Sequence, residues 1–201
     1  EPHLYTFEIS VKNASESVSK TITTGIRTVN IIKKKDEYGE SFIFEINRQK
    51  IFAKGANWIP ADSLLPRLNE MDYKRLIAMA KQANMNMLRI WGGGIYEYDW
   101  FYDECDKNGI MVWQDFMFAC DIYPDEFDFF VDNFKKEAEY QIKRLRNHPC
   151  IVLWCGNNEN NWGFRDWWGY GDPEFLGNRI YKKVLLSILS KLDETRPYHI
   201  S

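Results

Sequence analysis

The sequence predicts an α/β fold in which a β-rich segment precedes a parallel sheet covered by helices. Two observations support this prediction. The first fifty of the 201 residues alternate apolar and polar side chains as strands do, and from about residue 51 strand-like and helix-like segments follow one another in turn. Parallel neighbours need a crossover, so this alternation predicts right-handed strand–helix–strand units. Five such strands are too few to close an eight-stranded barrel, and the chain therefore reads as truncated.

The first fifty residues are predicted to form antiparallel strands. Residues 4–13 place four apolar side chains on one face, namely Tyr5, Phe7, Ile9 and Val11, and residues 25–32 form a second strand-like run. Residues 41–55 alternate, turn through residues 47–50 and resume at Ile51, as a hairpin does. These strands are the expected end of a β-sandwich followed by a hairpin that closes the next domain.

Five strands and four helices are predicted after this segment. The strands cover 51–58, 85–91, 110–116, 150–155 and 198–201, and the helices cover 70–84, 96–109, 127–149 and 178–193. Asn69 and Asp72 form a capping-box pattern before the first helix. Gly109 stands where the second helix should end, and Pro149 stops the third. There are no internal repeats.

Composition excludes several classes of function. A net charge of −3 gives no basic surface for nucleic acid, and the run of Lys33 to Lys35 is followed at once by Asp36 and Glu37. No apolar stretch reaches the ~18 residues of a membrane span, and the first residues lack a signal-peptide pattern. The cysteines lack C-x-x-C spacing, so free thiols and no metal ion are expected. A cytoplasmic location is favoured over secretion, which stays open.

Polar or aromatic side chains follow four consecutive predicted strands. In order, they are Asn57 and Trp58, then Arg89 and Trp91, then Gln114 and Asp115, then Asn157, Asn158 and Glu159. The carboxyl ends of parallel strands meet at one rim, so one shared pocket is predicted there. Two structural readings remain open, because Arg89 can be an ion-pair partner of Asp115 and Asp115 can be a buried anchor for neighbouring donors.

Three other features of the rim need an explanation. Three glycines, Gly92 to Gly94, follow Trp91 without the Lys and Ser or Thr of a phosphate loop, so no cofactor is expected. Trp162, Trp167 and Trp168 lie in a predicted loop and suit a wall on which sugars stack. Glu159 stands alone among asparagines, and a carboxyl group in an aromatic-rich cleft can serve as the proton donor of a glycosidase.

Four stretches carry a resemblance to a known family. "FAKGANWIPAD", "NMLRIWGGGIYE", "GIMVWQDFMFACDIYP" and "IVLWCGNNE" resemble, in that order, the β-mannosidases of glycoside hydrolase family 2. The resemblance implies that residues 1–35 end an immunoglobulin-like sandwich. It also implies that residues 36–201 form the first half of a (β/α)8 catalytic barrel, whose remainder would be the main partner of this chain.

The same resemblance assigns roles to single residues. Glu159 is expected to be the general acid/base, and Asn158 is expected to contact the 2-hydroxyl of the sugar. The nucleophile is expected on strand seven, beyond this chain, with Arg89 supporting it. The remaining expected contacts are Trp58 and Trp91 in the wall of the sugar site, Asp115 in its floor, and Trp167 or Trp168 at its rim.

The expected activity follows from these roles. The full-length enzyme should remove terminal non-reducing β-D-mannose from β-mannosides or mannose-containing oligosaccharides with retention, and these 201 residues alone should be inactive. Two alternatives are kept. One is a β-galactosidase or β-glucuronidase of the same family, and the other is a non-catalytic carbohydrate-binding module.

Overall fold

The computed structural model describes residues 3–169 and 177–201. A five-stranded parallel sheet forms its centre, with the strand order β10-β9-β8-β7-β6. The strands are β6 (Gly55–Trp58), β7 (Met87–Ile90), β8 (Met111–Asp115), β9 (Ile151–Cys155) and β10 (Tyr198–His199). Strands that follow one another in sequence are also neighbours in the sheet. This is the arrangement predicted for successive strand–helix units of a barrel.

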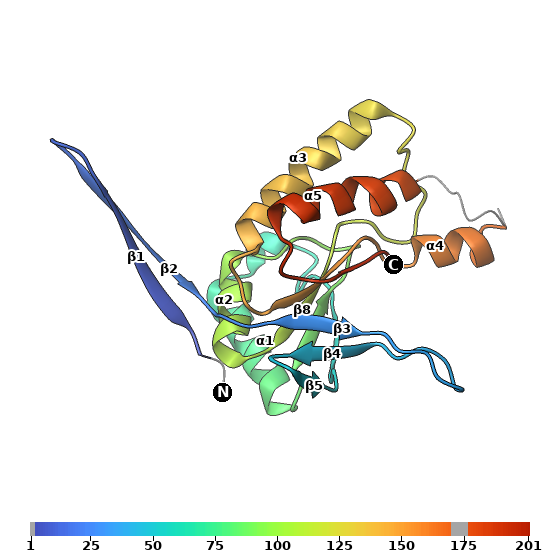
Figure 1. The fold of residues 1–201 in the computed structure, drawn as a ribbon, viewed down its shortest axis with the longest axis horizontal. Coiled ribbons are helices and arrows are strands. Elements are labelled where there is room, and N and C mark those ends of the chain that lie inside the picture. The colour runs from blue at the N-terminus through green and yellow to red at the C-terminus, as the bar shows by residue number, and fades with distance from the viewer. Residues whose placement is uncertain (1–2, 170–176) are drawn as a thin grey trace.

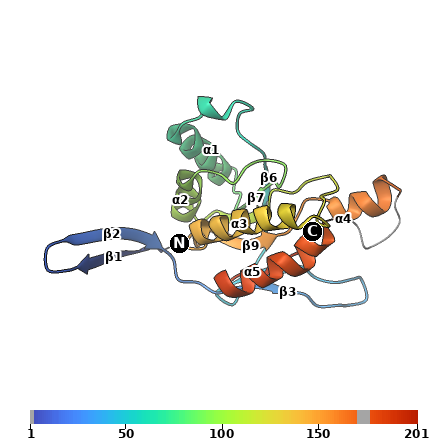
Figure 2. The ribbon, with the colours of Figure 1, turned by 90° about the horizontal axis from the view of Figure 1, so that it is seen from above.

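Helices cover one face of this sheet and bury the main apolar core (Figure 1, Figure 2). They are α1 (Glu70–Gln82), α2 (Asp99–Asn108), α3 (Asp128–Leu145) and α5 (Leu185–Leu192), with the short turns η1 (Leu65–Arg67) and η3 (Ile180–Val184). The predicted apolar stripe of α3 is confirmed, because Val131, Phe134, Ala138, Ile142 and Leu145 are all buried. Within the described ranges, no helix is long and apolar enough to cross a membrane.

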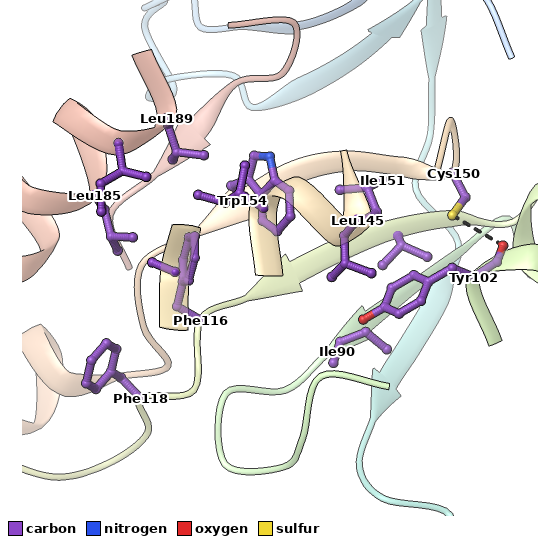
Figure 3. Packing of buried hydrophobic residues seen from close by; sticks show 14 of the residues in the cluster. Ile90, Tyr102, Phe116, Phe118, Leu145, Cys150, Ile151, Trp154, Leu185 and Leu189 are labelled. Atoms are coloured by element: carbon purple, nitrogen blue, oxygen red, sulfur yellow. Dashed lines mark hydrogen bonds between the residues drawn. The ribbon is translucent and has the colours of Figure 1, made fainter. Parts of the chain in front are cut away.

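Aromatic rings fill the layer between the sheet and the helices (Figure 3). Phe116, which directly follows β8, stacks on Trp154 of β9 with ring centroids 5.6 Å apart. Both side chains are fully buried, as is Leu145 at the end of α3. The indole Nε1 of Trp154 donates a hydrogen bond to Asp193 over 2.9 Å, so the polar atom of this ring is not left without a partner.

The predicted start of α1 and end of α2 are confirmed, whereas α3 ends at Leu145, before the predicted stop at Pro149. The Asn69 side chain accepts a hydrogen bond from the backbone of α1, and the Asp72 side chain accepts one from the backbone N–H of Asn69. Gly109 ends α2 in the left-handed conformation, with φ of 69°. These local signals involve only neighbouring residues, which is why the sequence was enough to find them.

A small antiparallel sheet covers the other face of the parallel sheet. It consists of β3 (Val29–Ile32), β4 (Ile43–Ile46) and β5 (Gln49–Ile51), and it packs Val29 and Phe44 against Met87, Val152 and Leu153. The predicted hairpin is confirmed, with Asn47 and Arg48 both at positive φ in its turn.

Two predictions about the strands need correction. The strand predicted over residues 51–58 is divided, because Ile51 closes the antiparallel sheet and the parallel strand begins only at Gly55. The second strand of the first fifty residues is β2 (Ser17–Thr24), which pairs with β1 (Tyr5–Lys12). The sequence of β2 is rich in Ser and Thr. Its apolar residues Val18 and Ile22 pair with apolar residues of β1, but Lys20 stands between them on the same side of the strand. The alternation of apolar and polar residues in β2 is therefore hard to recognise.

The β1–β2 hairpin projects from the body of the molecule (Figure 1). Its register places Phe7 opposite Ile22 and Val11 opposite Val18, so one face of the ribbon is apolar and the other is polar. Tyr5, Phe7, Ile9 and Val11 are between 43% and 70% exposed. The hairpin therefore contributes nothing to the core of the α/β unit.

Candidate active site

Arg89 and Asp115 form an ion pair at the carboxyl ends of β7 and β8. The guanidinium donates two hydrogen bonds to the carboxylate, from Nε over 3.1 Å and from Nη2 over 2.9 Å. Asp115 is fully buried and also accepts from the backbone N–H of Gly92 and the indole N–H of Trp113. Burial raises the pKa of the Asp115 carboxyl, and Arg89 opposes that shift. Arg89 is therefore an ion-pair partner of Asp115, and Asp115 is also a buried anchor for neighbouring donors, so both structural interpretations of the pair hold.

The three glycines after β7 are explained by close approaches rather than by a ligand. A Cβ on Gly92 would lie 2.5 Å from the carbonyl oxygen of Phe118, and a Cβ on Gly93 would lie 2.1 Å from the indole of Trp91. Trp91 is therefore folded over Gly93, next to the backbone N–H that Gly92 donates to Asp115. Trp91 is thus the residue next in sequence to Gly92, whose backbone N–H donates to Asp115.

Glu159 lies in the loop that follows β9, in a left-handed backbone conformation with φ of 63°. Such a conformation is uncommon for residues other than glycine, and it costs of order 1–3 kcal/mol unless the surroundings enforce it. The Oε2 atom of Glu159 accepts a hydrogen bond from Asn158 Nδ2 over 3.2 Å and one from the Cys120 thiol over 3.5 Å. Glu159 and Asn158 are thus held together at the rim, as predicted.

The neighbouring asparagines fix the loop that carries Glu159. Asn157 is fully buried, and its Oδ1 accepts from the backbone N–H of Asn160 and from the hydroxyl of Ser201. Its Nδ2 donates to the carbonyl of Ile200 over 2.9 Å. Asn160, also fully buried, donates to the hydroxyl of Tyr181. Asn157 and Asn160 are therefore structural residues that hold the loop around Asn158 and Glu159.

The tryptophans after Glu159 are helical, which corrects the predicted loop. α4 (Asn160–Trp162) continues into the π-helical turn η2 (Gly163–Trp167). Five-residue spacing in a π-helix brings Trp162 and Trp167 onto the same side, with ring centroids 5.0 Å apart. Both are about half exposed, whereas Trp168 packs partly against the core. Part of the variable segment after them, residues 170–176, lies outside the described residues.

Trp58 is not brought to the ion pair. In the sheet it pairs with Ile90, whose side chain is buried among the helices, so Trp58 points to the same side. Its ring contacts Phe101 with centroids 4.8 Å apart, and its Nε1 donates to the buried Glu97. Strand alternation thus places Trp58 in the packing layer, and Asn57, which pairs with Arg89, takes the inner side. The predicted role of Trp58 in a sugar-site wall does not fit this position.

One residue that holds Glu159 was missed as a member of the site. Cys120 contacts the carboxylate directly, and it had no distinctive sequence signal because a single cysteine in a loop is common. Asn157, predicted at the rim, instead shapes the loop beneath Glu159. Gln114, predicted at the rim, instead accepts from Tyr102 in the helix layer.

One group of side chains in the described ranges has the spacing of metal ligands. Asp103, Asp106 and His148 place ligand atoms within 4.8 Å of one another. Nδ1 of His148 lies 2.7 Å from Asp106, whose second oxygen accepts from the backbone N–H of Cys150. These contacts connect α2 to the segment before β9. The cluster stands at the opposite end of the strands from Glu159.

Comparisons with known proteins agree with this architecture. The model of the glycosyl hydrolases family 2 TIM barrel domain matches residues 40–201. The chain is 43% identical to a β-mannosidase of Capra hircus and 44% identical to one of Rattus norvegicus. Each of the two alignments covers 90% of the present chain. It spans only 22% and 21% of those relatives.

Solved structures give the same picture. A β-D-mannosidase from Dictyoglomus thermophilum is 52% identical over 99% of this chain and 25% of its own, with a TM-score of 0.90. A β-glucuronidase from Parabacteroides merdae has the same fold at 22% identity, with a TM-score of 0.78 over 99% of this chain and 23% of its own. Because the family model covers most of the sequence, the chain belongs to glycosyl hydrolase family 2, and residues 40–201 are part of its TIM barrel domain.

Proposed function

We propose that this chain is the acid/base-bearing part of a retaining β-mannosidase. One observation carries the proposal: Glu159 stands at the carboxyl end of β9, hydrogen-bonded to Asn158 and next to the rim that Arg89 and Asp115 build. In a barrel, reacting groups gather at this end of the strands. The expected product is mannose, released from the non-reducing end of a β-mannoside.

Glu159 would act twice in the reaction. A retaining glycosidase uses one carboxyl group as acid and then as base, and a second, ~5–5.5 Å away, as nucleophile. Glu159 first donates its proton to the glycosidic oxygen, and it later takes a proton from the water that hydrolyses the glycosyl-enzyme. By the family resemblance, the second carboxylate comes from a later strand, and Arg89 lies ready to support it.

Three side chains would surround the sugar. Asn158 offers its amide to the 2-hydroxyl, a contact that strengthens in an oxocarbenium-like transition state. Trp91 lies over the glycines beside the ion pair and can form a wall. Trp167, 46% exposed, offers a ring face at the rim. Asp115 would act through Arg89 and Gly92 rather than on the sugar itself.

The choice of mannoside rests on relatedness. The relatives at 43–44% identity are named β-mannosidase, as is the structure at 52% identity. The β-glucuronidase shares the fold at 22% identity, a level that supports architecture alone. A β-glucuronide or β-galactoside substrate is therefore the weaker candidate.

We also propose a division of the chain into two domains. Residues 1–35 would end an immunoglobulin-like sandwich, and residues 36–201 would form the first half of the barrel. The apolar, exposed face of the β1–β2 hairpin supports the first part, because such a ribbon is stable when a second sheet covers it. The family model, which begins at residue 40, supports the second.

The test uses the full-length protein that carries these residues. Purified enzyme is offered a panel of 4-nitrophenyl glycosides with β-mannosyl, β-glucuronyl and β-galactosyl groups, and kcat/KM is measured for each. The β-mannoside is expected to be the best substrate, with retained configuration in the first-formed mannose by NMR. A preference for another sugar would overturn the substrate assignment, and binding without hydrolysis of any glycoside would favour a carbohydrate-binding module.

A second measurement concerns these 201 residues alone. Retaining hydrolysis needs both carboxyl groups. The isolated chain is therefore expected to release no nitrophenol from the β-mannoside under conditions in which the full-length enzyme is active. Release by the isolated chain would show that the second carboxylate lies within it.

A further inference from the structure

The thiol of Cys120 belongs to the immediate surroundings of Glu159. Cys120 lies in the loop between β8 and α3, and its Sγ donates to Glu159 Oε2 over 3.5 Å. Asn158 Nδ2 donates to the same sulfur over 3.4 Å and to the same carboxylate oxygen over 3.2 Å. Three side chains thus form a closed triangle in which both donors are directed at Oε2.

The backbone holds this triangle in place. The N–H of Cys120 donates to the carbonyl of Asn158 over 3.0 Å, and the N–H of Asn158 donates to the carbonyl of Phe118 over 2.9 Å. Cys120 has φ of 49° and Glu159 has φ of 63°, so two non-glycine residues in left-handed conformations face each other. Each costs of order 1–3 kcal/mol, and the paired loops must supply that energy.

The sulfur acts as a donor rather than as a thiolate. Cys120 is exposed, but partial desolvation of its thiol, and next the hydrogen bond to Glu159, raise the pKa of that thiol. The S–H group therefore keeps its proton at neutral pH. A protonated thiol can donate one hydrogen bond, and the carboxyl group of Glu159 is the acceptor within its reach.

We propose that Cys120 is a positioning residue for the acid/base and that the catalytic proton is carried on Oε1 of Glu159. Two donors occupy Oε2, so the proton of the acid form must sit on the other oxygen. That proton passes from Oε1 to the glycosidic oxygen when the glycosidic bond breaks. In the second step Oε1 takes a proton from the attacking water. The thiol keeps its own proton throughout, and this inference rests on the proposed function.

A purely structural role for Cys120 makes different predictions. If Cys120 only fills its loop, replacing it by glycine should relieve the left-handed backbone and leave catalysis unchanged. If the thiol positions Glu159, the glycine variant should lose the same catalytic assistance as an alanine variant. A serine variant keeps a donor at nearly the same place and should retain most of it.

The experiment compares C120A, C120G and C120S in the full-length enzyme. E126A is the matched control, because Glu126 is an exposed residue of the same loop. Two substrates separate the steps. Phenyl β-mannoside needs a proton on its leaving oxygen, whereas 2,4-dinitrophenolate leaves without one, so only the first substrate depends on the acid in kcat/KM.

A positioning role predicts a selective loss. C120A and C120G should lower kcat/KM for the phenyl substrate about fivefold, the worth of one hydrogen bond to a carboxylate, and leave the dinitrophenyl substrate within about twofold. C120S and E126A should resemble the wild type.

Other outcomes would overturn the proposal. Equal losses on both substrates, or full activity of C120G on the phenyl substrate, would show that the thiol does not act through the acid. If C120A fails to fold, C120G still decides the question, since glycine fits the backbone. If the wild-type enzyme prefers another glycoside, the substrate proposal fails but the same comparison is made on phenyl and dinitrophenyl forms of that sugar. A wild type that cleaves no glycoside overturns both.

Discussion

The two ends of the parallel sheet differ in what their inner side chains do. At the amino-terminal end, Met87 and Val152 pack under Val29 and Phe44 of the small antiparallel sheet. At the carboxyl-terminal end, the same strands deliver an ion pair and the carboxyl group of Glu159. The same scaffold is therefore dry and apolar at one end and polar at the other.

The change from apolar to charged inner side chains takes place within a single strand, and in β7 it takes only two residues. β7 has Met87 and Arg89 on its inner side, and β8 has Met111 and Asp115 near its two ends. Because side chains alternate with a period of two, a strand can serve the core at its start and the rim at its end without changing face. Position along the strand, more than burial, therefore distinguishes residues that stabilise the fold from residues at the candidate site. Asp115, for example, is fully buried and yet lies at the carboxyl end, with the candidate site.

The largest effect on catalysis is expected from a change at Glu159, the rim residue proposed as the acid/base. E159Q in the full-length enzyme is expected to lower kcat/KM for phenyl β-mannoside about a thousandfold, within the usual worth of an acid/base group. The urea midpoint of unfolding should stay close to that of the wild type, because the amide has the same size as the carboxyl group and keeps an oxygen that accepts from Asn158 and Cys120. E126Q is the control. A loss of tenfold or less would place the acid/base elsewhere.

Asp115 should affect both properties, because it joins the two regions. D115N leaves Arg89 without its partner and is expected to cost about 3 kcal/mol of unfolding free energy. It should also lower kcat/KM by about tenfold or more through the displaced guanidinium. Urea unfolding and steady-state kinetics measure the two effects. D132N, which removes an exposed partner of Lys135, is the control. Loss of stability with full activity would make Asp115 an anchor only.

The smallest effect on catalysis is expected at the amino-terminal end. F44A removes a buried ring from the contact between the two sheets and should cost about 3 kcal/mol of unfolding free energy. The kcat/KM of the folded variant should remain within about twofold of wild type, because Phe44 reaches the ion pair only through Trp113, whose ring centroid lies 6.4 Å from that of Phe44 and whose indole donates to Asp115. F52A, at an 80% exposed ring, is the control. A large kinetic defect in F44A would mean that the two ends are coupled.

Local sequence signals identified most of the fold. The capping box at Asn69, the glycine at position 109 and the apolar stripe of α3 were all sufficient, because each depends on residues within one or two helical turns. β2 was missed, since its Ser and Thr residues give a weak pattern. The division between β5 and β6 was also missed, because both lie in one β-like run of sequence.

The candidate site was only partly predictable. The strand-end rule found Arg89, Asp115, Asn158 and Glu159, whose geometry at the rim follows from parallel strands. It placed Trp58 wrongly, because alternation turns that ring toward Phe101 and the helices. It also read the tryptophan segment as a loop, although a π-helical turn aligns Trp162 with Trp167.

The sequence by itself determined the order of strands and helices and the polar character of the rim, and it predicted Glu159 as the acid. Those features depend on local patterns and on chemical type. Only the tertiary structure decided that Asn157 and Asn160 are supports, that the glycines after Trp91 make room for neighbouring atoms, and that Cys120 reaches Glu159 across 39 positions of sequence. Contacts of that kind arise when separate loops are brought together by the sheet, and no periodicity within one segment can encode them.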